Sequence, residues 1–300
     1  MDTQLVRDFN AKASSFVYSF WQWRNSSWGA VYDVSRTVQA CLANQIRAFE
    51  FIAVESDSAI EQHFGGLILS SVVQRDDVLL IARVGRYRAS NGFSAWDASS
   101  QYIKRVVDQL LGCLCTDRLD VLLLEGNDFL TPVEETALAL RQLIDSGKVR
   151  ALGFSHMNID RQRQLSSLLE RDVLCSQLKL NLLDPTPLLD GRYDYVKQYF
   201  MRPMITAPLG GGLLASNESA RAVSIREELN RLALLYQASW TQIALAWLLQ
   251  LDALLVLGTL SEEVFQDAVL AQRIKLSHDD WYRLLGIAKL NLPPSLPLEP

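Results

Sequence analysis

The sequence repeats one pattern along most of its length, a short apolar run followed by a segment with apolar residues at helical spacing. Strands that are apolar on both faces and alternate with helices are typical of a parallel sheet covered by helices. Eight such runs occur, at residues 15–20, 49–54, 78–84, 119–125, 151–155, 175–181, 203–207 and 253–258.

Eight strand–helix units in 300 residues predict one (β/α)8 TIM barrel domain over residues 1–300. An open doubly wound sheet is the alternative, but the glycine-rich fingerprint of a dinucleotide-binding sheet is missing after the first run. Residues 291–300 are rich in proline and predict an extended tail. Thr131-Pro132-Val133-Glu134 predicts a helix start with a capping box and proline at its first position, and Ser224-x-x-Glu227 predicts another start.

Charge and composition narrow the class of partner. With 29 basic and 34 acidic residues and no basic run, nucleic acid and anionic membranes are not expected partners. Apolar runs such as 243–249 are too short to span a bilayer, and the N-terminus lacks the apolar core of a signal peptide. We therefore expect a cytoplasmic protein.

The four cysteines carry no metal signal. Cys113-Leu-Cys115 has neither zinc-knuckle nor CxxC spacing, and three histidines are too few to suggest a zinc site. We expect all four cysteines to be buried thiols and no metal to be bound.

In a barrel of this kind the site lies at the carboxyl ends of the strands, so a small-molecule ligand is expected there. Charged residues at such ends are also common as a solvated rim. Trp21, Trp23 and Trp96 are candidates for lining a pocket, and His156 for an acid/base group or a solvated polar residue.

Several stretches together resemble the aldo-keto reductase family, from about residue 45 to residue 270. They are RDDVLLIARVG (75–85), RLDVLLLEGND (118–128), ETALALRQLIDSGKVRALGFSHMN (135–158), SQLKLNLLD (176–184), APLGGGLLA (207–215) and QIALAWLLQ (242–250). The resemblance implies a (β/α)8 barrel that binds NADP(H). It also implies carbonyl reduction, in which a Tyr hydroxyl protonates the carbonyl oxygen while the nicotinamide delivers hydride.

The four catalytic positions of that family carry other residues in this chain. Anchored on Glu61-x-x-x-Gly65, the family's Asp falls on Glu50, its Tyr on Glu55, its Lys on Arg83 and its His on Glu125. There is no Tyr between residues 33 and 86, so a small shift in this assignment does not restore the family's acid. The resemblance therefore implies a degenerate catalytic tetrad.

The resemblance also assigns the cofactor-binding positions. Ser155 and Gln177 match contacts to the nicotinamide amide, with His156 replacing the usual Asn, and the glycine-rich loop matches the pyrophosphate site. The adenosine end maps to 258–268, where Glu262 and Glu263 are expected to repel a 2′-phosphate. We expect weakened NADP(H) binding, with NAD(H) or no cofactor as replacements. The assigned residues are Ser155, His156, Gln177, Pro208, Leu209, Gly210, Gly212, Gly258, Ser261 and Asp267.

Three functions fit these residues. The first is an NAD(P)H-dependent oxidoreductase in which Glu and Arg replace Tyr, Lys and His. The second is a catalytically inactive relative that acts as a binding or regulatory subunit, with a partner protein. The third is a redox-neutral lyase or cyclase in which Glu55 and Glu125 carry out acid/base chemistry.

Overall fold

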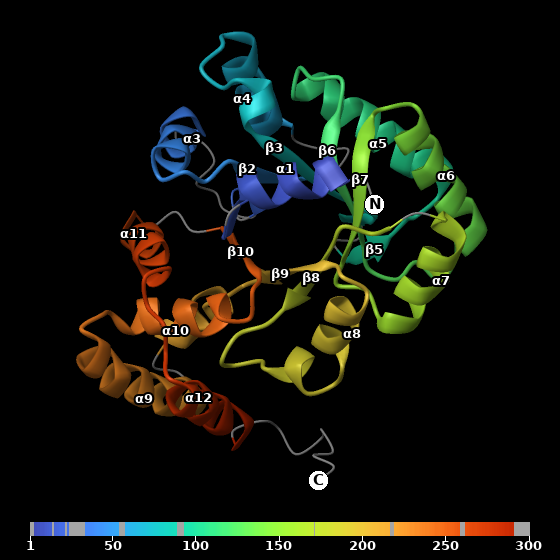
Figure 1. Cartoon of the computed structure of the whole chain (residues 1–300). Coiled ribbons are helices and arrows are strands. Elements are labelled where there is room, and N and C mark those ends of the chain that lie inside the picture. Colours follow the sequence, from blue (N-terminus) through green and yellow to red (C-terminus); the bar gives the residue numbers. More distant parts are fainter. Residues whose placement is uncertain are drawn as a thin grey trace. The chain divides into compact units, whose positions relative to one another are not determined.

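The computed structural model describes residues 3–13, 15–21, 23, 34–53, 58–88, 93–170, 172–216, 219–258 and 262–290. Eight strands form a closed barrel in the order β1-β10-β9-β8-β7-β6-β3-β2, which confirms the predicted fold (Figure 1). The barrel strands are β1 (Phe16–Ser19), β2 (Ala48–Ile52), β3 (Leu79–Val84), β6 (Leu119–Glu125), β7 (Val149–Ser155), β8 (Cys175–Lys179), β9 (Arg202–Thr206) and β10 (Leu254–Leu257).

The chain divides into two compact units, one of residues 1–177 with 196–202 and one of residues 178–195 with 203–300. The expectation of one domain over 1–300 stays a prediction. The helices are α1 (Thr3–Ala13), α3 (Val34–Ala43), α4 (Ala59–Leu69), α5 (Ser100–Cys113), α6 (Val133–Asp145), α7 (Ile159–Leu169), α8 (Arg192–Gln198), α9 (Ala220–Tyr236), α10 (Trp240–Leu249), α11 (Glu262–Ala271) and α12 (His278–Leu290).

In the first unit, alternate residues of β2 face opposite sides of the sheet. Phe49 and Phe51 lie against Phe64 of α4, each with its ring centroid 5.1 Å from that of Phe64. Glu50, between them, points to the other side, into the barrel. Trp23 is buried and donates a hydrogen bond from Nε1 to the Tyr18 hydroxyl at 3.3 Å, and its ring packs edge-on against Phe20 in this aromatic core.

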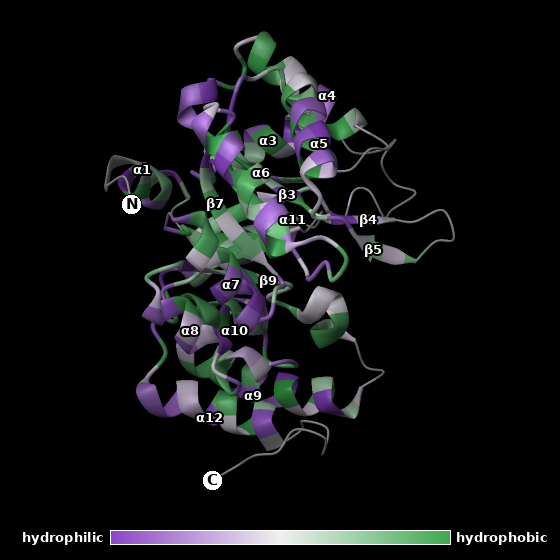
Figure 2. Ribbon diagram, turned by 90° about the vertical axis from the view of Figure 1, so that its right-hand side faces the viewer, coloured by the Kyte–Doolittle hydropathy of each residue, from purple (hydrophilic) through white to green (hydrophobic). Residues whose placement is uncertain are grey.

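A β-hairpin that the sequence pattern did not predict follows β3. It consists of β4 (Arg86–Arg88) and β5 (Ser94–Trp96), which pair antiparallel with Arg86 opposite Trp96. Figure 2 shows β4 as hydrophilic and the hairpin extending away from the barrel strands. With three residues in each strand, the hairpin is too short and too polar to give a core-strand signal.

The second unit is held by its own apolar contacts. Trp247 of α10 stacks on Trp281 of α12 with ring centroids 5.1 Å apart. Each indole donates to the other residue's backbone carbonyl, at 3.1 Å from Trp247 and 2.8 Å from Trp281. This reciprocal pair satisfies both indole N–H groups, of which Trp247 is buried and Trp281 half-buried.

Both predicted helix starts were wrong in detail. Pro132 is the N-cap of α6, which begins at Val133, and no side-chain cap bond forms there. Helix α9 begins at Ala220, where the Ser219 hydroxyl accepts from the backbone N–H of Ala222. A capping box does form, between Ser239 and Gln242 at the start of α10.

The cysteines are not all buried. Cys41 and Cys175 are buried, Cys113 is half-buried and Cys115 is exposed. Burial raises the pKa of Cys41 to about 12. It also raises the pKa of Cys175, which lies near Glu50. Neither buried thiol is therefore set up to react as a thiolate at neutral pH.

Among the described residues, no single helix has the length and hydrophobicity to cross a membrane. Helices α9 and α10 reach that length and composition only as a pair, with a 91° bend between them.

Candidate functional site

Five polar side chains lie at the carboxyl ends of neighbouring strands in the first unit. The strands place them in register, since Glu125 of β6 is paired with Ser155 of β7, and Ser155 with Gln177 of β8. All five are buried: Glu50, Arg83, Glu125, Ser155 and Gln177. This end of the sheet is where barrels of this kind hold their ligands.

Arg83 lies between two carboxylates. Its Nε is 3.3 Å from Glu50 Oε1 and 3.3 Å from Glu125 Oε2. Arg86, at the start of the hairpin, places Nη1 3.5 Å from the other oxygen of Glu125. Glu125 therefore contacts two guanidinium groups, those of Arg83 and Arg86, and Arg83 also contacts Glu50.

Burial and the neighbouring charges act on Glu50 in opposite directions. Burial is the largest effect and raises the pKa of Glu50, because removing the carboxylate from water disfavours its ionised form. The Arg83 cation and hydrogen bonds from Gln177 and Ser19 lower that pKa, while nearby Glu125 raises it. The net result is a pKa of Glu50 above its ordinary value.

Both the nitrogen and the oxygen of the Gln177 side-chain amide are hydrogen-bonded. Its Nε2 donates to Glu50 Oε2 at 3.0 Å, and its Oε1 accepts from the Ser155 hydroxyl at 2.7 Å. His156, which follows Ser155, is exposed and has a positive φ of 49°. Ser155 and Gln177, both assigned to the nicotinamide amide, thus bond to each other and to the ion-pair cluster.

The chain turns sharply after β6. Gly126 has φ of +78°, and a Cβ at this position would collide with the Trp96 indole. Trp96 therefore lies over the backbone next to Glu125. Asp128 holds the neighbouring segment, because its carboxylate accepts from the N–H groups of Ala98 and Leu130, both at 2.8 Å.

Asp128 keeps its negative charge through these bonds. Burial alone would raise its pKa, but bonds from the Thr131 side chain and from the backbone N–H groups of Ala98, Leu130 and Thr131 outweigh burial. The pKa of Asp128 is therefore lowered from its ordinary value. Sequence reasoning missed Asp128, although it stands just after β6, a strand of the predicted barrel.

The remaining cofactor-site predictions fall in the second unit. The loop 208–214 contains three glycines with positive φ, at Gly210, Gly211 and Gly212. A Cβ built at either of the last two meets no atom of the described residues within 4 Å, chain neighbours aside. Pro208 is buried, whereas Leu209 and Gly258 are half-buried. Open glycine backbone of this kind suits the approach of a phosphate group.

Asp267 has a packing role. Its Oδ2 accepts from the Ser239 hydroxyl at 2.7 Å and its Oδ1 from Gln242 Nε2 at 2.6 Å, which attaches α11 to the capped start of α10. Its predicted contact with a cofactor is not tested. Glu55 and Ser261 lie outside the described residues.

The residues assigned to the nicotinamide end of NADP(H) are already hydrogen-bonded within the protein. Gln177 and Ser155 already bond to each other, and Gln177 also bonds to Glu50. The open glycine loop fits a phosphate, but it says nothing about hydride chemistry.

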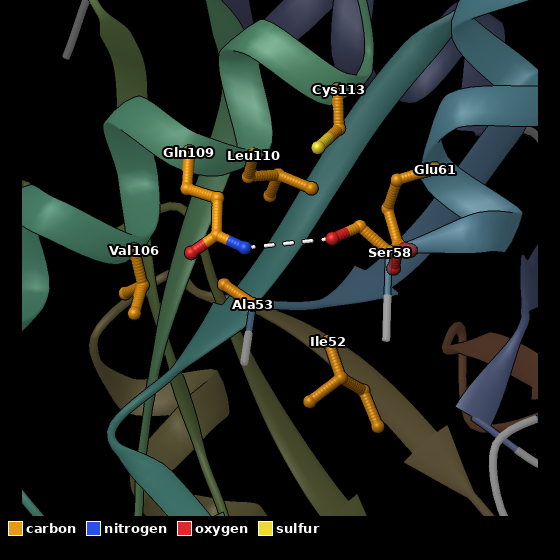
Figure 3. A pocket seen from close by; sticks show the side chains of 8 residues that line it. All are labelled: Ile52, Ala53, Ser58, Glu61, Val106, Gln109, Leu110 and Cys113. Atoms are coloured by element: carbon orange, nitrogen blue, oxygen red, sulfur yellow. Dashed lines mark hydrogen bonds between the residues drawn. The ribbon is translucent and has the colours of Figure 1, made fainter. Parts of the chain in front are cut away.

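A separate small pocket lies between α4 and α5, outside the ion-pair cluster (Figure 3). It encloses about 200 Å³, including space open to solvent, and the buried Glu61 carboxylate reaches it. Across it, Gln109 Nε2 donates to the Ser58 hydroxyl at 3.4 Å. The lining residues are Ile52, Ala53, Ser58, Glu61, Val106, Gln109, Leu110 and Cys113.

No group of three or more His, Cys, Asp or Glu side chains is arranged to hold a metal ion within the part of the chain that the structure describes.

The model of the Aldo/keto reductase family matches residues 26–289. The chain belongs to the aldo/keto reductase family. This family member is 27% identical over 282 residues to the 6-dehydroglucose reductase of Agrobacterium fabrum (strain C58), covering 92% of this chain and 94% of that one. It is also 27% identical over 281 residues to the oxidoreductase YdhF of Escherichia coli (strain K12), covering 90% and 92%. The solved glycerol dehydrogenase from Gluconobacter oxydans superposes with a TM-score of 0.77 at 17% identity, covering 88% of each chain, and so supports the fold.

Proposed function

We propose that this member of the aldo/keto reductase family binds a small molecule at the carboxyl end of its barrel without reducing it. The observation that carries the proposal is the position of Arg83 between Glu50 and Glu125, at 3.3 Å from each. On the assignment given by the family resemblance, these three residues stand at the positions of the catalytic Lys, Asp and His, and the tetrad is degenerate.

The cluster is poorly suited to protonating a carbonyl. Glu125 lies against the guanidinium groups of both Arg83 and Arg86, so its carboxylate oxygens already face two cations. Glu50 has the raised pKa that an acid needs, yet it is 1% exposed and bonded to Gln177. Arg83 cannot act as a proton donor, because a guanidinium keeps its proton throughout the physiological range.

Cofactor binding should be weak for the same reason. A nicotinamide amide would have to compete with the bonds that Gln177 makes to Glu50 and Ser155. We therefore expect weakened binding of NADP(H) and NAD(H) compared with family members that keep the tetrad. A partner protein and a cytoplasmic setting stay predictions from the sequence.

The runner-up is an NAD(P)H-dependent oxidoreductase in which a Glu replaces Tyr as the acid. The reductase names of relatives such as the Agrobacterium protein favour it. The Glu at the Tyr position is Glu55, which lies outside the described residues. The third function, a redox-neutral lyase or cyclase, depends on Glu55, which lies outside the described residues.

Titration of the purified chain with NADPH and NADH separates these proposals. We expect little quenching of tryptophan fluorescence, and no loss of reduced-nicotinamide absorbance with a panel of aldehydes and ketones.

The quadruple variant Glu50→Asp, Glu55→Tyr, Arg83→Lys, Glu125→His restores the family's residues and is expected to gain measurable turnover. Turnover by the unmodified chain would overturn the proposal in favour of the oxidoreductase.

A further inference from the structure

The hairpin that follows β3 presents a cation and an aromatic ring on one face. Arg86 and Trp96 are directly opposite in the antiparallel pair, so their side chains project from the same side. The contacts agree with this. Arg86 reaches Glu125, and Trp96 lies over Gly126, the residue that follows Glu125.

Both side chains are accessible to a ligand. The Arg86 side chain is 51% exposed, and Trp96 is 43% exposed. Arg86 is held by two contacts. Its Nη2 donates to the Ser94 hydroxyl at 2.9 Å, and its Nη1 lies 3.5 Å from Glu125 Oε1. The contact with Ser94, which lies on the same hairpin, orients the guanidinium without neutralising it.

The pair between Arg86 and Glu125 is the one that a ligand can replace at low cost. It is longer than the contact between Arg83 and Glu125, at 3.5 Å against 3.3 Å, and its cation is half in solvent. Exposed pairs contribute little to stability. If Arg86 turned to a ligand, Glu125 would still face Arg83 and would not be left as a buried, unpaired charge.

We propose that Arg86 and Trp96 form a binding site for a flat organic anion, with its carboxylate on the Arg86 guanidinium and its ring against the Trp96 indole. A guanidinium matches a carboxylate in geometry as well as charge, and an exposed indole offers a large apolar face beside it. The inference rests on the proposed function in that it names the class of ligand bound at the barrel mouth. In the absence of ligand, the Glu125 carboxylate pairs with the Arg86 guanidinium, and the carboxylate of the ligand replaces it on binding.

Benzoate is the probe, used on the full chain without any nicotinamide. Benzamide has the same ring but no charge, and cyclohexanecarboxylate has the charge but no flat ring. We expect benzoate to quench tryptophan fluorescence and to bind about tenfold more tightly than either control, equivalent to about 1.4 kcal/mol. Equal binding of benzoate and benzamide, or no binding of benzoate, would overturn the inference.

Three variants assign the contacts. Arg86→Gln is expected to weaken benzoate about tenfold and to leave benzamide unchanged, since a single charge-assisted contact is lost. Trp96→Phe is expected to remove most of the quenching while calorimetry still detects binding. Glu125→Gln is expected to tighten benzoate binding, because Arg86 then loses its internal competitor.

The Glu125→Gln result is decisive, because a misfolded variant does not gain affinity. Weaker benzoate binding by Glu125→Gln would contradict the proposed exchange. These titrations contain no nicotinamide, so their failure is separate from failure of the proposed function. Turnover of NADPH would overturn that function, whereas absent benzoate binding would overturn this inference alone.

Discussion

The Nε of Arg83 lies 3.3 Å from Glu125 Oε2, and both side chains are withdrawn from solvent. The same nitrogen faces Glu50 at 3.3 Å, so one cation lies between two carboxylates. Such a cluster is costly to desolvate and is stable only while it is complete. Its energetics can therefore be tested separately from any ligand.

Replacing Arg83 by Met should destabilise the protein by about 3–5 kcal/mol, because Glu50 and Glu125 are then buried without their shared cation. Urea unfolding at neutral pH measures this loss. The loss should shrink as pH falls and Glu50, whose pKa is raised by burial, becomes protonated. Arg86→Met is the matched control, since this exposed cation also lies on Glu125 but should cost less than about 1 kcal/mol. Equal costs for the two variants would contradict the special position of Arg83.

Glu50 should make stability fall with rising pH. Its pKa is raised on folding, so between the ordinary value of about 4.3 and the folded value the native state binds more protons than the unfolded state. The contribution of Glu50 to stability is therefore fully present below this window, and it is lost as pH rises through it. In Glu50→Gln that decline should disappear, so the variant's unfolding free energy relative to wild type should increase with pH.

The measurement for Glu50 is urea unfolding at a series of pH values. Glu134→Gln, which removes an exposed carboxylate from the first turn of α6, is the control for the loss of one negative charge. A pH dependence of Glu50→Gln parallel to that of wild type would contradict the prediction.

At the opposite end of β6, Asp120 is expected to contribute to stability and not to ligand binding. It is 2% exposed, lies 2.9 Å from Arg75 and 3.3 Å from Arg150, and accepts from the backbone N–H of Leu80 at 2.9 Å. Asp120→Ala should cost about 3 kcal/mol, as expected for removing one partner of a buried pair.

Asp117→Ala is the control for Asp120. Its carboxylate pairs with Arg118 at 3.3 Å but is 84% exposed, so its loss should be small. Thermal unfolding compares the two variants, and benzoate titration checks the mouth. A change in benzoate affinity without a change in unfolding temperature in Asp120→Ala would show that the two ends of β6 do not have separate roles.

The barrel was predictable because its signal is repeated. Each strand is apolar on both faces, and that pattern survives an error of one or two residues at either end. The helix starts were less predictable. A capping box was expected at Thr131, but α6 begins after Pro132 without one, and the box occurs at Ser239 instead. Short local motifs compete with the surrounding packing, so their positions are weakly specified.

The site was predictable in part. Glu125 and Arg83 could be assigned because they end or interrupt apolar strands. The pairing of Arg86 with Trp96 could not be predicted, since it depends on a hairpin with only three residues in each strand. The hydrogen bond from Gln177 to Glu50 also could not be predicted from the sequence, because 127 residues separate the two. Contacts of this kind are set by the closed arrangement of the strands.

Gly126 should control the position of Trp96, and Gly147 provides a control matched in backbone conformation. Their φ angles are +78° and +77°. A Cβ at Gly126 would meet the Trp96 indole, whereas a Cβ at Gly147 would meet no atom of the described part of the chain within 4 Å, chain neighbours aside. Replacing either by Ala should cost about 1–2 kcal/mol for the left-handed backbone. Only Gly126→Ala should also displace the indole, change the fluorescence spectrum and weaken benzoate binding.

A double-mutant cycle isolates that contact. In a Trp96→Ala background the collision is absent, so the extra cost of Gly126→Ala over Gly147→Ala should vanish. Urea unfolding of the four variants and their parents supplies the free energies. If the extra cost persists without the indole, it arises from backbone strain at Gly126 and not from Trp96. In that case Gly126 would not determine the position of the Trp96 ring beside Arg86, and the strand pairing of the hairpin alone would determine it.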